Sequence, residues 1–165
     1  MPVEINPLTG QEYYAGSTED VVRFAKSLNI DQGRLASVKP INVLGYMQTV
    51  EGAIDGYLAE SYFLPIKPYN QVKADGTVAL VFPQRLRMLA QMWAAGLMLL
   101  SEFQSTEQNL NDAGQKLVED AKKEVYQMTL WNHRIPGQRY KSLISHTCPP
   151  NFEPPQHLVE QLWQM

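Results

Sequence analysis

The chain has only one cysteine, three histidines and no cluster of lysines or arginines. A single cysteine, Cys148, excludes an intrachain disulfide and a zinc site built from several cysteines. The 14 basic residues are scattered and outnumbered by 17 acidic ones, which argues against a protein that grips DNA by neutralising its phosphates. The longest apolar stretch, Met92 to Leu100, is far shorter than a transmembrane helix. We therefore expect neither a DNA-gripping nor a membrane-spanning protein.

The N-terminus also lacks a basic stretch followed by an apolar one, so we expect no secretory signal and a protein that stays where it is made. What the sequence does contain is enough material for a folded core. Hydrophobic residues make up 44% of the 165 residues, and charged residues make up 19%. This length suits one compact domain with an appendage.

Four segments have apolar residues at the three- and four-residue spacing of an amphipathic helix, which predicts an all-α bundle of four helices over residues 17–135. The predicted helices span residues 17–28, 40–62, 83–100 and 105–135. Ser17 or Thr18 is expected to cap the first helix, and Pro40 and Pro83 to begin the second and third. Ser105 or Thr106 is expected to cap the fourth.

Each longer helix has a predicted buried face. That of the second helix comprises Ile41, Leu44, Met47, Val50, Ile54, Tyr57 and Leu58. That of the fourth comprises Leu110, Ala113, Leu117, Ala121, Val125 and Met128. The third helix is apolar around most of its circumference, which predicts a central position. Gly52 and Gly56 have a spacing that lets another backbone approach the second helix closely.

Residues 63–82 break the helical pattern and predict a β-hairpin between the second and third helices. Residues 71–74 and 77–80 flank Asp75 and Gly76, a dipeptide that readily supplies the two positive φ angles of a type I′ turn. A lone hairpin is marginally stable in water. We therefore expect it to lean on the helices or on a neighbouring subunit, with Asp75 and Gly76 at the contact.

The two ends of the chain are predicted to lie outside the helical bundle. Residues 1–16 are predicted to form an extended N-terminal arm. Residues 136–165 hold five of the 11 prolines and are predicted to form an extended C-terminal arm with a short helix at 156–164. Such a segment docks on a partner, straps its own domain or stays disordered, and a tryptophan near its end favours docking. The residues expected to bind a partner are Tyr140, Phe152, Leu158, Leu162 and Trp163.

The sequence contains no recognisable catalytic constellation, glycine-rich phosphate loop or metal-ligand spacing. His146 and Cys148 are two residues apart and would suit a base and its nucleophile only if they shared one side of a strand. An incidental pair in a loop is the favoured interpretation. We therefore expect a protein without cofactor, metal or enzymatic activity. A hydrolase or transferase that uses His146 and Cys148 is the alternative of a different class.

The stretch from Ile54 to Pro65, with the sequence IDGYLAESYFLP, resembles the signature of the head–tail connector proteins of tailed bacteriophages, the neck adaptor family. Those proteins have an Ile-Asp-x-Tyr-Leu run, then an aromatic residue and Leu-Pro, and then a proline-led helix with an Ala-rich leucine stripe. Here residues 83–100 match that helix, and residues 21–24 resemble the family's opening helix. The resemblance covers roughly residues 17–130.

The resemblance implies a structural role in the neck of a virion that is assembled in the host cytoplasm. About twelve copies would form a ring with heterologous contacts. The ring would dock beneath the portal protein, extend the DNA channel without binding DNA specifically, and carry the next neck protein. A head-closure (stopper) or tail-completion role is the nearer alternative. Within the signature, Ile54, Tyr57, Leu58 and Tyr62 are expected in the core, and Asp55 on the polar face or capping a neighbour.

Overall fold

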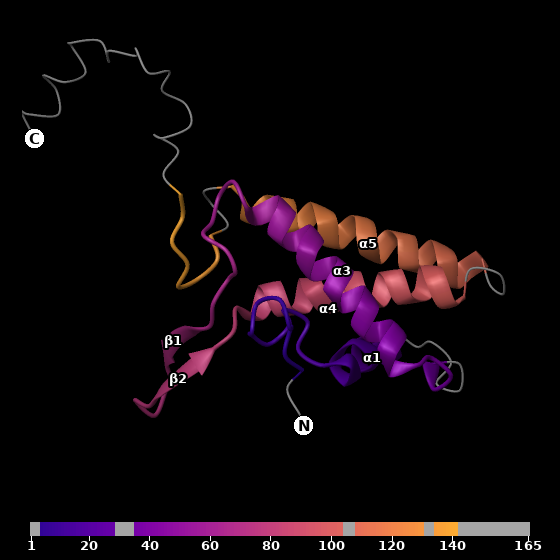
Figure 1. The fold of residues 1–165 in the computed structure, drawn as a ribbon, viewed down its shortest axis with the longest axis horizontal. Coiled ribbons are helices and arrows are strands. Elements are labelled where there is room, and N and C mark those ends of the chain that lie inside the picture. The colour runs from indigo at the N-terminus through magenta and orange to yellow at the C-terminus, as the bar shows by residue number, and fades with distance from the viewer. Residues whose placement is uncertain (1–3, 29–34, 104–107, 131–133, 142–165) are drawn as a thin grey trace, which may run out of the picture.

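The computed structural model of the protein describes residues 4–28, 35–103, 108–130 and 134–141. These residues form four helices and one two-stranded antiparallel sheet (Figure 1). The helices are α1 (Thr18–Ser27), α3 (Pro40–Leu58), α4 (Gln84–Glu102) and α5 (Gln108–Met128), and the strands are β1 (Tyr69–Val72) and β2 (Val78–Val81). The fold is therefore mostly α, with a hairpin between α3 and α4.

Helix α4 lies at the centre and packs against α1, α3 and α5. Helix α5 runs antiparallel to α4, and α3 crosses over this pair (Figure 1). Nine of the 19 residues of α4 are buried. This confirms the central position that its apolar circumference predicted.

Three helix starts agree with the prediction. Ser17 caps α1, because its hydroxyl accepts a hydrogen bond from the backbone N–H of Asp20 while the Asp20 carboxylate accepts one from the Ser17 backbone. Pro40 occupies the first turn of α3, and Pro83 is the N-cap of α4. These starts depend on local chemistry, so the sequence was sufficient to find them.

The predicted buried faces are right in part. The apolar residues of α3 that are fully buried are Val43, Met47, Val50, Ile54 and Leu58. Ile41 and Tyr57, both predicted to be buried, are 68% and 40% exposed, because the elements packed on α3 cover a face centred on Met47 and Ile54. On α5, Ala113 was predicted to be buried but is exposed, and the next residue, Gly114, is buried instead.

Residues 4–17 fold against α3, which differs from the predicted extended arm. Isolated bridges join Ile5 to Glu12 and Tyr13 to Gly16, so the segment is a compact loop. Tyr13 and Tyr14 are both only 1% exposed. Two large aromatic side chains buried next to each other in sequence bury enough apolar area to hold the segment in place.

The hairpin forms where it was predicted, but its turn is longer. Tyr69 pairs with Val81 and Val72 pairs with Val78, so residues 73–77 form the loop. The N–H of Gly76 donates to the carbonyl of Lys73 at 2.9 Å, and Gly76 has a φ of 79°. Loops of this length combine an ordinary turn with one left-handed glycine, and they replace the predicted two-residue type I′ turn.

The fourth helix ends at Met128, before the predicted end at residue 135. Its predicted cap at Ser105 or Thr106 lies outside the described residues. Residues 134–141 return along the end of α3, where Tyr140 forms a bridge with Tyr62. Gly137 lies so close to β1 that a Cβ there would be 2.3 Å from the Cβ of Tyr69, and its φ is 72°. A glycine is therefore required where the returning segment meets the hairpin.

Candidate interaction surfaces

The hairpin projects away from the helices (Figure 1). One of its faces carries exposed apolar side chains. Because Val72 pairs with Val78 and Asn70 pairs with Leu80, these four side chains lie on the same side of the sheet. Val72, Val78 and Leu80 are 69%, 62% and 70% exposed. Apolar side chains of this exposure on a two-stranded sheet are typical of a surface that another chain covers.

The two residues predicted to make the hairpin contact lie at its tip and are exposed. The Asp75 carboxylate accepts hydrogen bonds from the backbone N–H and the hydroxyl of Thr77, at 2.9 and 2.6 Å. These bonds lower the pKa of Asp75 below its ordinary value. Asp75 and Gly76 therefore shape the turn, while the apolar contact area is provided by the strands. The alternation of Val78 and Leu80 in the sequence was the signal for this surface.

Tyr140 is the one predicted partner-binding residue of the C-terminal arm that the structure describes. Its ring packs edge-on against Tyr62, with centroids 5.2 Å apart, and its hydroxyl donates to the backbone carbonyl of Thr129. Tyr140 is therefore engaged within its own chain and only partly buried, and its docking role stays a prediction. The others, Phe152, Leu158, Leu162 and Trp163, lie outside the described residues.

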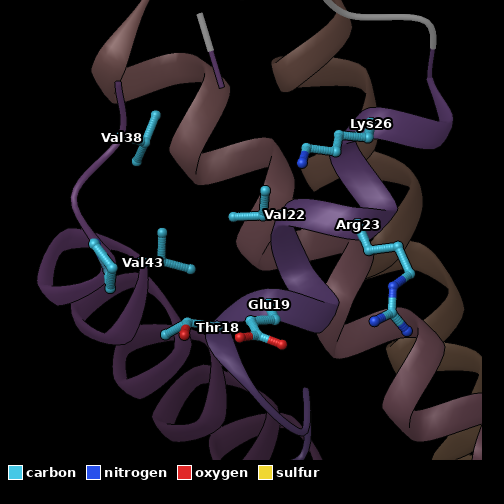
Figure 2. A pocket seen from close by; sticks show the side chains of 8 residues that line it. Thr18, Glu19, Val22, Arg23, Lys26, Val38 and Val43 are labelled. Atoms are coloured by element: carbon cyan, nitrogen blue, oxygen red, sulfur yellow. The ribbon is translucent and has the colours of Figure 1, made fainter. Parts of the chain in front are cut away.

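A groove of about 380 Å³ lies between α1 and the start of α3 (Figure 2). Val22, Val38 and Val43 form its apolar sides, and Glu19 and Lys26 lie at its rim. Arg23 also lines the groove, so its charged side chains are one acid and two bases.

A buried acidic residue holds the N-terminal segment on α3. Glu51 is only 4% exposed, and its two carboxylate oxygens accept hydrogen bonds from the Asn6 side chain at 2.8 Å and the Tyr14 backbone at 3.2 Å. Burial raises the pKa of Glu51 above its ordinary value, and the two hydrogen bonds partly oppose this shift. Both oxygens are used within the fold, so Glu51 acts as a clamp for residues 6–14.

Asp55, one turn further along α3, continues this network. Its carboxylate accepts a hydrogen bond of 2.7 Å from the Tyr14 hydroxyl, which itself accepts one of 2.9 Å from the backbone N–H of Ile66. Burial raises the pKa of Asp55, and burial together with the Asp55 carboxylate raises that of Tyr14. Neither acidic residue lines the groove in Figure 2. The network joins three segments of the chain and is suited to holding the fold together.

The signature stretch is mainly a determinant of the fold. Ile54, Leu58 and Tyr62 are fully buried, as predicted, and the Tyr62 hydroxyl donates to the Met128 carbonyl at 2.8 Å and accepts from the backbone N–H of Ile135 at 3.1 Å. Asp55 anchors Tyr14, which is a more specific role than the predicted place on a polar face. These contacts fix the end of α3 relative to α5 and the returning segment.

No protein-family model, curated protein or solved structure matches this chain. The resemblance to phage connectors therefore depends on the residues of the signature stretch.

The candidate catalytic pair, His146 and Cys148, lies outside the described residues, as do His133 and His157. Within residues 4–28, 35–103, 108–130 and 134–141, no three His, Cys, Asp or Glu side chains are grouped closely enough to hold a metal ion. Over the same residues, no helix has both the length and the apolar character that crossing a membrane requires. Among the described residues, the hairpin strands carry three exposed apolar side chains, Val72, Val78 and Leu80.

Proposed function

We propose that this protein is a structural head–tail connector of a tailed bacteriophage. Copies of it form a ring of about twelve subunits in the virion neck. The ring docks on the portal protein, extends the DNA channel and carries the head-closure or tail-completion protein. In this proposal the helices form the rigid body of each subunit. The protein acts by binding its neighbours in the neck and catalyses no reaction.

The exposed apolar face of the hairpin carries the proposal. Val72, Val78 and Leu80 are exposed on a two-stranded sheet, and a hairpin alone is only marginally stable in water. Full burial of each of these side chains is worth about 1.5–3 kcal/mol. A neighbouring subunit that covered this face would gain several such contributions and would also stabilise the hairpin. A heterologous ring provides that neighbour, because each subunit presents one surface to the next.

The charge of the chain fits a channel through which DNA moves. The net charge is −3, and the 14 basic residues do not form a run in the sequence. A strongly basic lining would bind the phosphates and slow the passage of DNA. We therefore expect the DNA to pass through the ring without specific binding.

The test is negative-stain electron microscopy of the purified protein, alone and after mixing with the portal protein of the same virus. We expect rings, either free or stacked on the portal. A variant with Val72→Ser, Val78→Ser and Leu80→Ser should remain folded by circular dichroism but lose ring formation. The matched control changes three exposed apolar residues on helices α3, α4 and α5, with Ile41→Gln, Met88→Gln and Tyr126→Gln.

Two results would contradict the proposal. One is a protein that neither forms rings nor binds portal at any concentration tested. The other is ring formation that survives the hairpin changes and is lost in the control variant. Portal binding is measured separately by co-sedimentation, so that a protein that binds only the head-closure protein is identified as a stopper or tail-completion protein instead.

A further inference from the structure

A second groove, of about 510 Å³, lies at the base of the hairpin between residues 63–68 and 137–139. The Gln138 side chain ties its two walls together, because it donates to the Lys67 carbonyl at 2.7 Å and accepts from the Lys67 N–H at 3.3 Å. Phe63, Leu64, Pro65 and Pro68 supply apolar lining. Phe63 is 61% exposed, so this lining is open to a ligand.

The same groove carries positive charge. Lys67 and Arg139 both line it and are exposed, and no ion pair to either is found among the described residues. Residues 134–141 contain no acidic residue, and the Lys141 ammonium donates to the Ala59 carbonyl. The Lys141 ammonium lies 5.5 Å from the centre of the Phe63 ring. The groove is therefore suited to a chain segment with large apolar side chains, carboxylates and no cations.

Residues 142–165 of the protein have this composition. These 24 residues contain Glu153 and Glu160 and no lysine or arginine. Their large apolar residues include Leu143, Ile144, Phe152, Leu158, Leu162 and Trp163. A fully extended chain spans at most roughly 3.3–3.6 Å per residue, so 24 residues are long enough to reach a neighbouring copy.

The direction in which the chain leaves the domain favours a second copy as the acceptor. Gln138 lies beside Lys67, Tyr140 pairs with Tyr62, and the Lys141 N–H donates to the Ser61 carbonyl at 2.8 Å. The chain therefore runs antiparallel to the first wall of the groove and moves away from it towards α3. Binding in its own groove would require the chain to reverse its direction after Lys141, which favours a groove on a second copy.

We infer that residues 142–165 of one copy dock in the groove formed by Phe63, Leu64, Lys67 and Arg139 of a second copy. This deepens the proposed function and rests on it for the presence of neighbouring copies. The apolar side chains of the segment cover Phe63 and Leu64, and its glutamates approach Lys67 and Arg139. In a ring, each subunit both gives and receives one segment.

The first experiment measures this contact directly. A fluorescein-labelled peptide with the sequence of residues 142–165 is titrated with the full-length protein, and binding is followed by fluorescence anisotropy. We expect saturable binding that weakens at least tenfold in a Lys67→Glu, Arg139→Glu variant. A Lys116→Glu, Lys123→Glu variant makes the same change of charge on the exposed side of α5 and should bind like the original protein.

A charge exchange then distinguishes docking between copies from docking within one copy. Self-association is measured by sedimentation velocity for two variants, Lys67→Glu with Arg139→Glu and Glu153→Lys with Glu160→Lys. We expect each variant to associate more weakly than the original protein when tested separately. A mixture of the two should recover association, because each segment then meets a groove of opposite charge on the other variant.

Three outcomes would overturn the inference: no binding of the peptide, equal binding to the groove variant, and no recovery in the mixture. The last would indicate docking within one chain. The readouts also separate this inference from the proposed function. Groove-dependent peptide binding without any portal docking would contradict only the connector role, whereas portal docking without groove-dependent binding would contradict only the segment exchange.

Discussion

The backbones of α4 and α5 touch where Gly96 faces Gly114. A Cβ atom on either glycine would lie 2.9 Å from the backbone carbonyl oxygen of the other. A Cβ on Gly96 would also lie 2.8 Å from a methyl group of Val118. The two helices are therefore as close here as their main chains allow, and the approach depends on the absence of both side chains.

We expect Gly96→Ala and Gly114→Ala each to lower the free energy of unfolding by about 1–3 kcal/mol, because the backbone carbonyl opposite cannot move aside as a flexible side chain would. The measurement is urea denaturation followed by circular dichroism. Gly52→Ala is the matched control, since no heavy atom lies within 4 Å of the Cβ position there. That change should stabilise α3 by about 0.5–1 kcal/mol. Equal stability of Gly96→Ala and the original protein would contradict the close approach.

The Tyr14 hydroxyl provides a second test, because it joins α3 to the segment that leads into the hairpin. Tyr14→Phe removes the donor to Asp55 and leaves the backbone N–H of Ile66, a fully buried residue, without its acceptor. We expect a loss of about 1–3 kcal/mol in the free energy of unfolding. Tyr13→Phe is the control, because the Tyr13 hydroxyl only accepts a bond from the partly exposed Gln48 side chain. If both variants lost the same amount, the network would have no special role.

Local chemistry was enough to predict three helix starts and the presence of two paired strands, but not the type of turn that joins the strands. The capping box at Ser17, the prolines at 40 and 83, and the Asp-Gly pair at 75–76 each act within a few residues, so the sequence alone locates them. The buried face of a helix is harder to predict when apolar residues surround it. This is why Ile41 and Tyr57 of α3 were assigned to the core although they are exposed.

Contacts between distant segments could not be predicted in the same way. Gly52 and Gly56 have the spacing of a close helix contact, yet both face open space, and the contact forms instead between Gly96 and Gly114. The groove at the base of the hairpin has walls about 70 residues apart, joined by Gln138 and Lys67. The sequence of one wall does not indicate where the other wall lies in the chain. Only the folded chain therefore brings Lys67 and Arg139 to the same groove.

The buried carboxyl groups predict how stability depends on pH. The pKa values of Glu51 and Asp55 are raised in the folded state, mainly by burial, so the folded protein binds their protons more tightly than the unfolded chain does. Their contribution to stability is therefore smallest above the raised folded pKa values and increases as the pH falls through them towards the ordinary carboxyl range. It is fully present below the unfolded pKa values.

The measurement is the free energy of unfolding of the original protein and of Glu51→Gln at several pH values between 7 and 4. We expect the difference between the two to change with pH, in the direction that favours the original protein at lower pH. Glu51→Gln should also be less stable throughout, because its amide N–H₂ group must face the N–H groups of Asn6 or Tyr14. A difference that stayed constant with pH would contradict the raised pKa of Glu51.

The boundary between the folded domain and the C-terminal segment is the last prediction. The sequence predicts this boundary at residue 136. The structure places Gln138, Tyr140 and Lys141 in contact with Lys67, Tyr62 and Ala59. A protein ending at Lys141 keeps these contacts and should therefore unfold at a higher urea concentration than one ending at Gly137. Tyr140→Ala in the full-length chain should reproduce much of that loss, because it removes the packing on the buried Tyr62 ring and the hydrogen bond to Thr129. If the protein ending at Gly137 were as stable as the one ending at Lys141, residues 138–141 would belong to the partner-binding segment after all.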